Sequence, residues 1–252
     1  MPRCQGKYPY TYLLPMEKVI IIVNAEVTTA GTITLASPAT NTMVTALKRA
    51  ISANSPTTLV EVMAAASAWS KAFTLRESHE HPIYCPLTID LPYQLPFPGQ
   101  KIYQACKNIQ GQRHWVEETL GYKTSMADTW LGDLWLPIIL TPSKTLYGEV
   151  IGEGIVPNSY YQPINLPQKV YKSLHFLGDQ LLKSLEAVPS VYLLQFRLLE
   201  TEIVFDRLWP FPAAPAIASL GHPQGDLFAH YWNCISQQPR LNQVRSRKSV
   251  EA

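Results

Sequence analysis

Two histidines come nearest to a metal-binding pattern in this sequence. His79 and His81 are separated by one residue within a Glu-Ser-His-Glu-His run, a spacing found in metal sites. A zinc site needs at least three protein ligands, and the sequence offers no third ligand at a matching distance. We therefore interpret this run as a polar loop. The other histidines form no pattern of nucleophile and base: His114, His175, His222 and His230.

The cysteines also carry no recognisable chemistry. They occur singly, with no Cys-x-x-Cys pair and no spacing typical of a disulfide framework. No nearby group of basic residues indicates a lowered thiol pKa. We therefore interpret all four as buried or incidental thiols: Cys4, Cys85, Cys106 and Cys234.

The composition describes a folded protein with no strong electrostatic preference. The chain has 252 residues, 46% of them hydrophobic and 16% charged, which suits one large domain or two small ones. Lys and Arg total 21 against 19 Asp and Glu, too small an excess to favour a nucleic acid as the main partner. The longest run of large apolar residues, Val19–Val23, is far shorter than the ~20 residues of a membrane span. These features favour a soluble, cytoplasmic protein without a membrane partner.

The first half of the chain predicts one buried strand followed by helices. Residues 18–24 are apolar and β-branched on both faces, which is typical of a fully buried strand. Residues 42–54 and 59–73 are predicted as helices separated at Pro56, although a helix-turn-strand-helix order would also fit. Residues 101–110 predict a short helix. The His-Trp-Val-Glu-Glu run at 114–118 alternates like a strand.

The second half predicts an α+β order. Residues 134–140 and 146–156 read as strands, and apolar residues recur on one face of a helix that begins near Pro167. Residues 191–199 and 202–208 predict an antiparallel hairpin that turns at Glu200-Thr201. Asp226 is suited to cap a final helix. The chain beyond residue 239 is polar and basic, as in a solvated tail.

Several segments together resemble one family in their order and spacing. In Thr32–Ile51 a proline turn precedes a helix with a Lys-Arg pair at its end, and His114–Tyr122 contains adjacent glutamates. Four further segments follow in the family's order: Glu153–Pro157, Val191–Phe196, Glu202–Pro210 and Asp226–Pro239. Over these segments the chain resembles the ATP-grasp part of 5-(carboxyamino)imidazole ribonucleotide synthase, a carboxylating enzyme of purine biosynthesis. The resemblance covers four fifths of the chain.

The resemblance implies an α+β, ATP-grasp-like fold of two α+β subdomains with antiparallel sheets. The expected organisation is an N-terminal extension with one strand (1–31), a degenerate subdomain A (32–113), subdomain B (114–239) and a basic flexible tail (240–252). The family's N-terminal nucleotide-fold domain is expected to be missing, because only 31 residues precede the region of resemblance.

The resemblance also implies a small set of site residues. Glu117 and Glu118 match paired glutamates that reach the nucleotide, and Glu153 lies in another matching segment. We interpret these three as a nucleotide-binding or remnant site, and Asp206 as a remnant Mg²⁺ ligand. The alternatives are a solvated pair for the two adjacent glutamates, and a surface carboxylate or one paired with Arg207 for Asp206.

The departures from the family fall on charged positions. The segment that should carry a lysine and a glycine-rich phosphate loop is Cys85–Gln100, which has no Lys or Arg and a single glycine. Gln195 replaces a metal-binding glutamate, and Phe205-Asp206 replaces an Asn-Glu pair. Trp209–Ala216 replaces the Arg-Pro-His-Asn stretch that should hold substrate, and it contains neither arginine nor histidine.

We therefore predict a catalytically impaired ATP-grasp-like protein that acts by binding a protein partner or, weakly, a nucleotide. The apolar strip Trp209–Pro215 is the predicted contact surface for the partner. The alternative is an active ATP-dependent ligase with displaced ligands, which would require ATP and Mg²⁺ as cofactors. The hypothesis of a nucleic-acid partner rests only on the basic tail.

Overall fold

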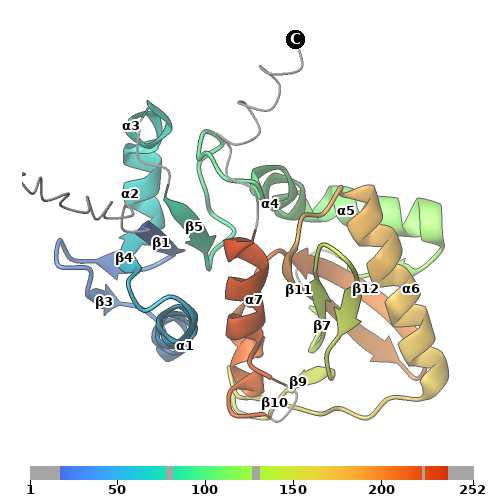
Figure 1. The fold of residues 1–252 in the computed structure, drawn as a ribbon. Coiled ribbons are helices and arrows are strands. Elements are labelled where there is room, and N and C mark those ends of the chain that lie inside the picture. The colour runs from blue at the N-terminus through green and yellow to red at the C-terminus, as the bar shows by residue number, and fades with distance from the viewer. Residues whose placement is uncertain (1–17, 78–81, 127–130, 223–224, 238–252) are drawn as a thin grey trace, which may run out of the picture.

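The computed structural model describes residues 18–77, 82–126, 131–222 and 225–237 (Figure 1). The predicted loop around His79 and His81 and the predicted basic tail lie outside these residues. Within them, no helix is both long enough and apolar enough to cross a membrane.

A small parallel sheet forms the N-terminal part of the described chain. Its order is β4-β1-β5, with β1 at Lys18–Val23, β4 at Leu59–Ala64 and β5 at Ile83–Pro86. Residues 19–23 are at most 2% exposed, which confirms the predicted buried strand. Helix α1 (Pro38–Asn54) joins β1 to β4, and α2 (Ala65–Ser70) and α3 (Ala72–Glu77) join β4 to β5. The hairpin of β2 (Glu26–Val27) and β3 (Ile33–Leu35) precedes α1.

A larger, mainly antiparallel sheet forms the C-terminal part. Its order is β10-β9-β7-β11-β12-β6, and β8 also pairs with β7. The strands are β6 (Lys123–Thr124), β7 (Leu134–Leu140), β8 (Thr145–Tyr147), β9 (Ile151–Glu153), β10 (Tyr160–Tyr161), β11 (Ser190–Leu199) and β12 (Glu202–Trp209). The predicted β11-β12 hairpin is confirmed, with Glu200 at a positive φ of 56° in its turn.

Two long helices pack on this sheet (Figure 1). Helix α7 (Leu227–Ser236) lies between the two sheets and contacts both α1 and β11. Helix α6 (Gln168–Ser184) packs so closely on the sheet that a Cβ on Gly178 would lie 2.8 Å from Cδ1 of Ile138. The remaining helical elements are α4 (Gln100–Lys107), α5 (Ile109–Trp115), a π-helical turn η1 (Val116–Leu120) and a 3₁₀ turn η2 (Ala214–Ser219).

The strand predicted at residues 114–118 is wrong, because this segment is helical. It continues α5 into η1 and ends at Gly121, which has a φ of 70°. The buried residues Gln112, Arg113 and Val116 share one face of this helix, whereas Glu117 and Glu118 are exposed. Apolar and polar residues alternate over only a few positions here, whereas the buried positions recur with the period of a helix.

The helix predicted over residues 59–73 is also partly wrong. Its first six residues form β4, which pairs with β1 in parallel register, Val19 opposite Val60. Only the alanine-rich remainder is helical, as α2 and the start of α3. Burial of β-branched residues against β1 outweighs the helix propensity of the segment. The helix-turn-strand-helix alternative therefore describes this region correctly.

The predicted α+β, ATP-grasp-like class is confirmed, with one difference in the sheets. The small sheet is parallel throughout, whereas antiparallel sheets were expected in both subdomains. The predicted boundary between residues 31 and 32 assigns β1 to the N-terminal extension, whereas its partner strands β4 and β5 both follow that boundary. The predicted strand at 146–156 is two strands, β8 and β9.

Candidate functional site

Asp206 lies at a β-bulge between β11 and β12 of the larger sheet. On β11, Gln195 and Phe196 are consecutive, but their partners on β12 are Arg207 and Phe205. Asp206 is thus the extra residue of β12, and such a bulge redirects a side chain out of the regular alternation.

The buried carboxylate of Asp206 is held by two arginines and a backbone amide. Nη2 of Arg113 donates to Oδ1 of Asp206, and Nε of Arg207 lies 3.2 Å from the same oxygen. The N–H of Gly132 donates to Oδ2 at 2.8 Å. The side chain of Asp206 is fully buried and that of Arg113 is 3% exposed. Arg113 also donates from Nε to the backbone oxygen of Asp206 at 3.0 Å, which fixes α5 against β12.

Gln195, at the position expected for a metal-binding glutamate, belongs to a second buried network. Its Nε2 donates to the oxygen of Gly132 at 2.6 Å, and its Oε1 accepts from the indole N–H of Trp209 at 2.8 Å. A Cβ on Gly132 would lie 2.6 Å from the backbone oxygen of Phe196, so this close approach requires glycine.

These contacts do not fit a Mg²⁺ site. Magnesium needs an octahedral set of oxygen ligands, several of them usually water molecules. Both carboxylate oxygens of Asp206 already accept hydrogen bonds, and two guanidinium groups lie where a cation would be repelled. The described residues contain no group of three or more His, Cys, Asp or Glu side chains suited to hold a metal. The geometry agrees with the alternative in which Asp206 pairs with Arg207, and it adds Arg113.

The adjacent glutamates lie on the exposed side of η1. Oε1 of Glu117 accepts a hydrogen bond from the hydroxyl of Thr124 on β6, whereas the described residues give the side chain of Glu118 no hydrogen bond or ion pair. The predicted strand end, from which both side chains would reach a nucleotide, is therefore replaced by a helical turn. Their role as a nucleotide site stays a prediction.

Glu153 is an exposed residue at the end of β9. Its Oε1 accepts from the N–H of Asn158 at 3.1 Å, and its own N–H donates to the oxygen of Asp133 at 3.1 Å. Glu153 and Asp206 thus both contact the segment that leads into β7, Glu153 at Asp133 and Asp206 at Gly132. Among the described residues, no hydrogen bond or ion pair joins any two of the four predicted carboxylates.

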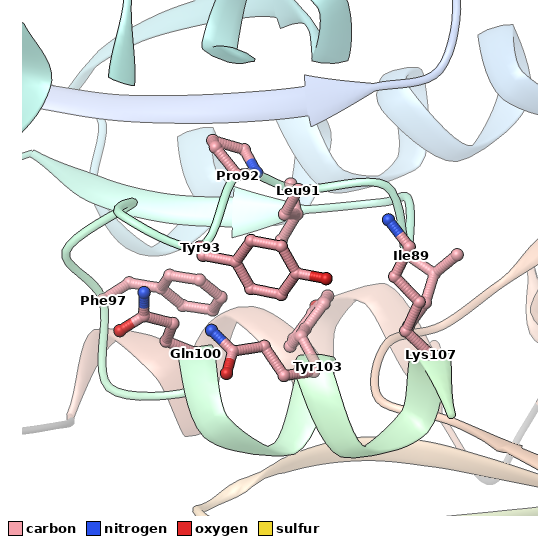
Figure 2. Close-up of a pocket in the computed structure, with 9 residues that line it drawn as sticks. Ile89, Leu91, Pro92, Tyr93, Phe97, Gln100, Tyr103 and Lys107 are labelled. Atoms are coloured by element: carbon pink, nitrogen blue, oxygen red, sulfur yellow. The ribbon is translucent and has the colours of Figure 1, made fainter. Parts of the chain in front are cut away.

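The segment that replaces the phosphate loop fills the space beside α4 (Figure 2). Four of its apolar side chains are at most 8% exposed: Leu87, Leu91, Leu95 and Phe97. The N–H groups of the same four residues, and that of Gln100, donate to backbone oxygens. Between this segment and α4 remains a cavity of about 10 Å³, room for one water molecule. A phosphate cradle needs free N–H donors and open space, and this segment supplies neither at these positions.

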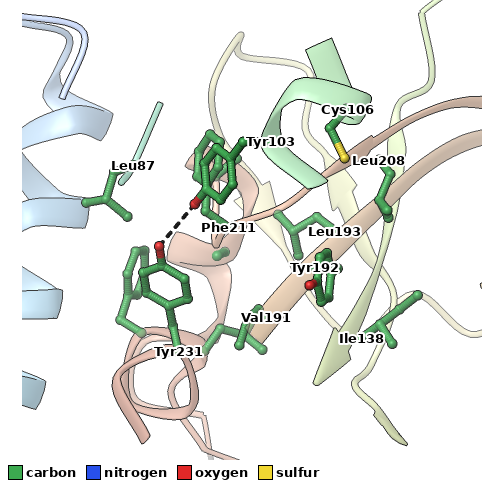
Figure 3. Packing of buried hydrophobic residues seen from close by; sticks show 14 of the residues in the cluster. Leu87, Tyr103, Cys106, Ile138, Val191, Tyr192, Leu193, Leu208, Phe211 and Tyr231 are labelled. Atoms are coloured by element: carbon green, nitrogen blue, oxygen red, sulfur yellow. Dashed lines mark hydrogen bonds between the residues drawn. The ribbon is translucent and has the colours of Figure 1, made fainter. Parts of the chain in front are cut away.

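The start of the same segment anchors the two sheets to each other (Figure 3). The hydroxyls of Tyr103 on α4 and Tyr231 on α7 lie 3.1 Å apart, and both are within 3.1 Å of the oxygen of Pro86. Both tyrosines are buried, and burial raises their pKa. They are therefore neutral hydrogen-bond donors that join β5 to α4 and α7.

The predicted contact strip Trp209–Pro215 is wrong as a surface, because most of it is buried. Phe211 is 3% exposed, and its ring stacks on Tyr103 with centroids 5.9 Å apart. The strip therefore belongs to the buried core, where Phe211 lies beside Tyr103 of α4 (Figure 3).

Three cysteines are buried free thiols, as predicted: Cys85, Cys106 and Cys234. Burial raises the pKa of Cys106 to about 12 and that of Cys234 to about 11, which suppresses the reactive thiolate.

Arg113, Gln195 and Trp209 form the buried polar networks, and sequence reasoning identified none of these contacts. Arg113 lies 93 residues before its partner Asp206, in a segment predicted as the approach to a strand. An available signal was the helical spacing of Gln112 and Val116, which would have placed Arg113 on the buried side.

Comparison with solved structures identifies the architecture. The chain aligns with glycinamide-RNase-transformylase T from Mycobacterium tuberculosis at a TM-score of 0.63 and 13% identity, over 87% of this chain and 79% of that one. It aligns with the ADP complex of N5-carboxyaminoimidazole ribonucleotide synthetase at a TM-score of 0.63 and 12% identity, over 90% and 79%. It aligns with an L-amino acid ligase from Bacillus licheniformis at a TM-score of 0.60 and 8% identity, over 90% of this chain and 76% of that one.

The chain has an ATP-grasp fold. No protein-family model and no curated protein sequence matches it. At these identities the similarity concerns the fold alone, because most side chains differ between this chain and the aligned structures.

Proposed function

We propose that this chain is a catalytically silent ATP-grasp protein that acts by binding a protein partner, through a surface other than the buried Trp209–Pro215 strip. In this proposal it derives from a carboxylate-amine ligase of purine biosynthesis, the class to which N5-carboxyaminoimidazole ribonucleotide synthetase belongs. The observation that carries the proposal is the buried pairing of Asp206 with Arg113 and Arg207.

Phosphoryl transfer depends on metal ions and cationic groups that neutralise the phosphates. In this chain the carboxylate at the expected metal position neutralises arginines of the protein itself, and Gln195 is engaged by Trp209 and Gly132. The filled segment 85–100 supports the same conclusion, because it leaves no open loop for a triphosphate.

The proposal is tested by thermal unfolding of the full chain with and without Mg-ATP. A nucleotide at about a hundred times its Kd stabilises a fold by about 2.7 kcal/mol, which raises the Tm by several degrees for a chain of this size. We expect no saturable rise in Tm at millimolar Mg-ATP.

A saturable rise would contradict the proposal if Glu117→Gln or Glu153→Gln weakened it. That result would support the alternative, an active ATP-dependent ligase with displaced ligands. These exposed carboxylates are better probes than Asp206, whose replacement would destabilise the fold itself.

A further inference from the structure

A larger cavity, of about 220 Å³, lies between the large sheet and the N-terminal part of α7, with Ser219 and Gly225 also in its lining. Its lining includes Pro137, Ile139 and Leu146 on the sheet and Glu149, Gln162 and His230 around them. None of Arg113, Gly132 and Arg207 lines it, so it is distinct from the surroundings of Asp206.

The sheet side of the cavity is an apolar floor. Ile139 on β7 pairs with Leu146 on β8, and the ring of Pro137 lies beside Gly148. On the opposite side, Gly225 has a φ of +106° and passes so close to His230 that a Cβ there would lie 2.9 Å from Nε2. This backbone conformation and this close approach both favour glycine.

The polar side of the cavity contains a carboxylate. Glu149 supplies a carboxylate, and Nε2 of His222 lies 3.2 Å from its Oε2. Among the described lining residues there is no lysine or arginine. Phosphate and carboxylate ligands are usually recognised by such cations, so this lining disfavours an anion and favours a ligand that donates N–H groups.

The volume limits the size of the ligand. A cavity of about 150 Å³ accommodates benzene, whereas drug-sized ligands occupy about 300–1,000 Å³. We propose that this cavity binds a small, single-ring organic cation or amidine-like heterocycle without a phosphate group. Its ring lies on the floor of Pro137, Ile139 and Leu146, and its N–H groups donate to Glu149.

The test uses benzamidine as the probe and the full chain. Calorimetry should detect saturable binding of benzamidine, and Glu149→Gln should weaken it about tenfold, the effect of removing one charged hydrogen bond. Benzamide, the neutral analogue, should bind more weakly and be unaffected by that variant. Glu26→Gln makes the same charge change at an exposed residue outside the lining of the cavity and should leave both affinities unchanged.

A second measurement needs no variant. Nuclear Overhauser effects should connect the ring protons of benzamidine to the methyl groups of Ile139 and Leu146. The proposal is overturned if benzamidine fails to bind at millimolar concentration, if Glu149→Gln leaves its affinity unchanged, or if phenyl phosphate binds more tightly. None of these outcomes bears on the Mg-ATP experiment, so the two proposals fail separately.

Discussion

The carboxylate of Asp206 contacts two guanidinium groups, of which only that of Arg207 is adjacent in sequence. The other, Arg113, comes from a helix and is itself 3% exposed. A buried ion pair stabilises little relative to an apolar pair, but removing one partner leaves a buried charge.

Asp206→Asn should therefore lower the free energy of unfolding by about 3–5 kcal/mol in urea denaturation. The matched control Glu118→Gln, on an exposed helical turn, should change it by less than about 0.5 kcal/mol. Equal effects of the two variants would show that the Asp206 pair is unimportant for stability.

The two tyrosine hydroxyls around Pro86 make a second prediction at this scale. Tyr103→Phe and Tyr231→Phe should each lower the free energy of unfolding by about 0.5–1.5 kcal/mol, because the remaining hydroxyl can still donate to the buried oxygen of Pro86. The double variant leaves that oxygen without either donor and should cost more than the sum. A strictly additive double-mutant cycle would contradict this arrangement.

Among the elements, α7 was predictable because its signals are local. Asp226 accepts from the N–H of Phe228 at 2.8 Å, as an N-cap does, and it also pairs with Arg49 on α1. The hairpin β11-β12 was predictable for the same reason, since its turn and its apolar runs are contiguous. In contrast, β4 becomes a strand only by pairing with β1, which lies about 40 residues away and outside any local pattern.

Asp226→Ala should lower stability by about 0.5–2 kcal/mol through loss of the cap on α7. Ser37→Ala, which removes the cap of α1 at Thr40, is the matched control and should have a similar effect. If Asp226→Ala lowers stability clearly more than Ser37→Ala, the ion pair with Arg49 should explain the difference, and Arg49→Met should lower stability by that amount. If Arg49→Met has no effect, this ion pair does not stabilise the fold.

His175 on α6 gives the fold a pH dependence. Its ring stacks on Tyr147 with centroids 3.8 Å apart, and desolvation lowers its pKa from 6.5 while the nearby Asp179 acts in the opposite direction. The unfolded chain therefore binds this proton more readily than the folded chain, so stability falls as the pH drops through 6.5. His175→Phe should flatten the decline in Tm between pH 7.5 and 5.5; an unchanged slope would exclude this residue as the source.

On the scale of the whole molecule, order and spacing of segments predicted the ATP-grasp fold, although identities to the aligned structures are 13% or lower. Core segments such as residues 191–196 keep a recognisable pattern because a packed sheet constrains size and polarity. The site was less predictable. The pairing of Arg113 with Asp206 and the burial of Trp209–Pro215 depend on contacts between distant segments, which no local pattern records.

The most direct test of the silent site uses the indole N–H of Trp209 as a reporter. This group donates to Gln195, at the position expected for a metal ligand, and its signal can be assigned among the six tryptophans with Trp209→Phe. The full chain is titrated with ATP and paramagnetic Mn²⁺ in a ¹H–¹⁵N spectrum. We predict that the Trp209 signal broadens no more than that of Trp69 on α2. Selective, saturable broadening of Trp209 would place a metal-nucleotide complex at Gln195 and Asp206 and contradict the account.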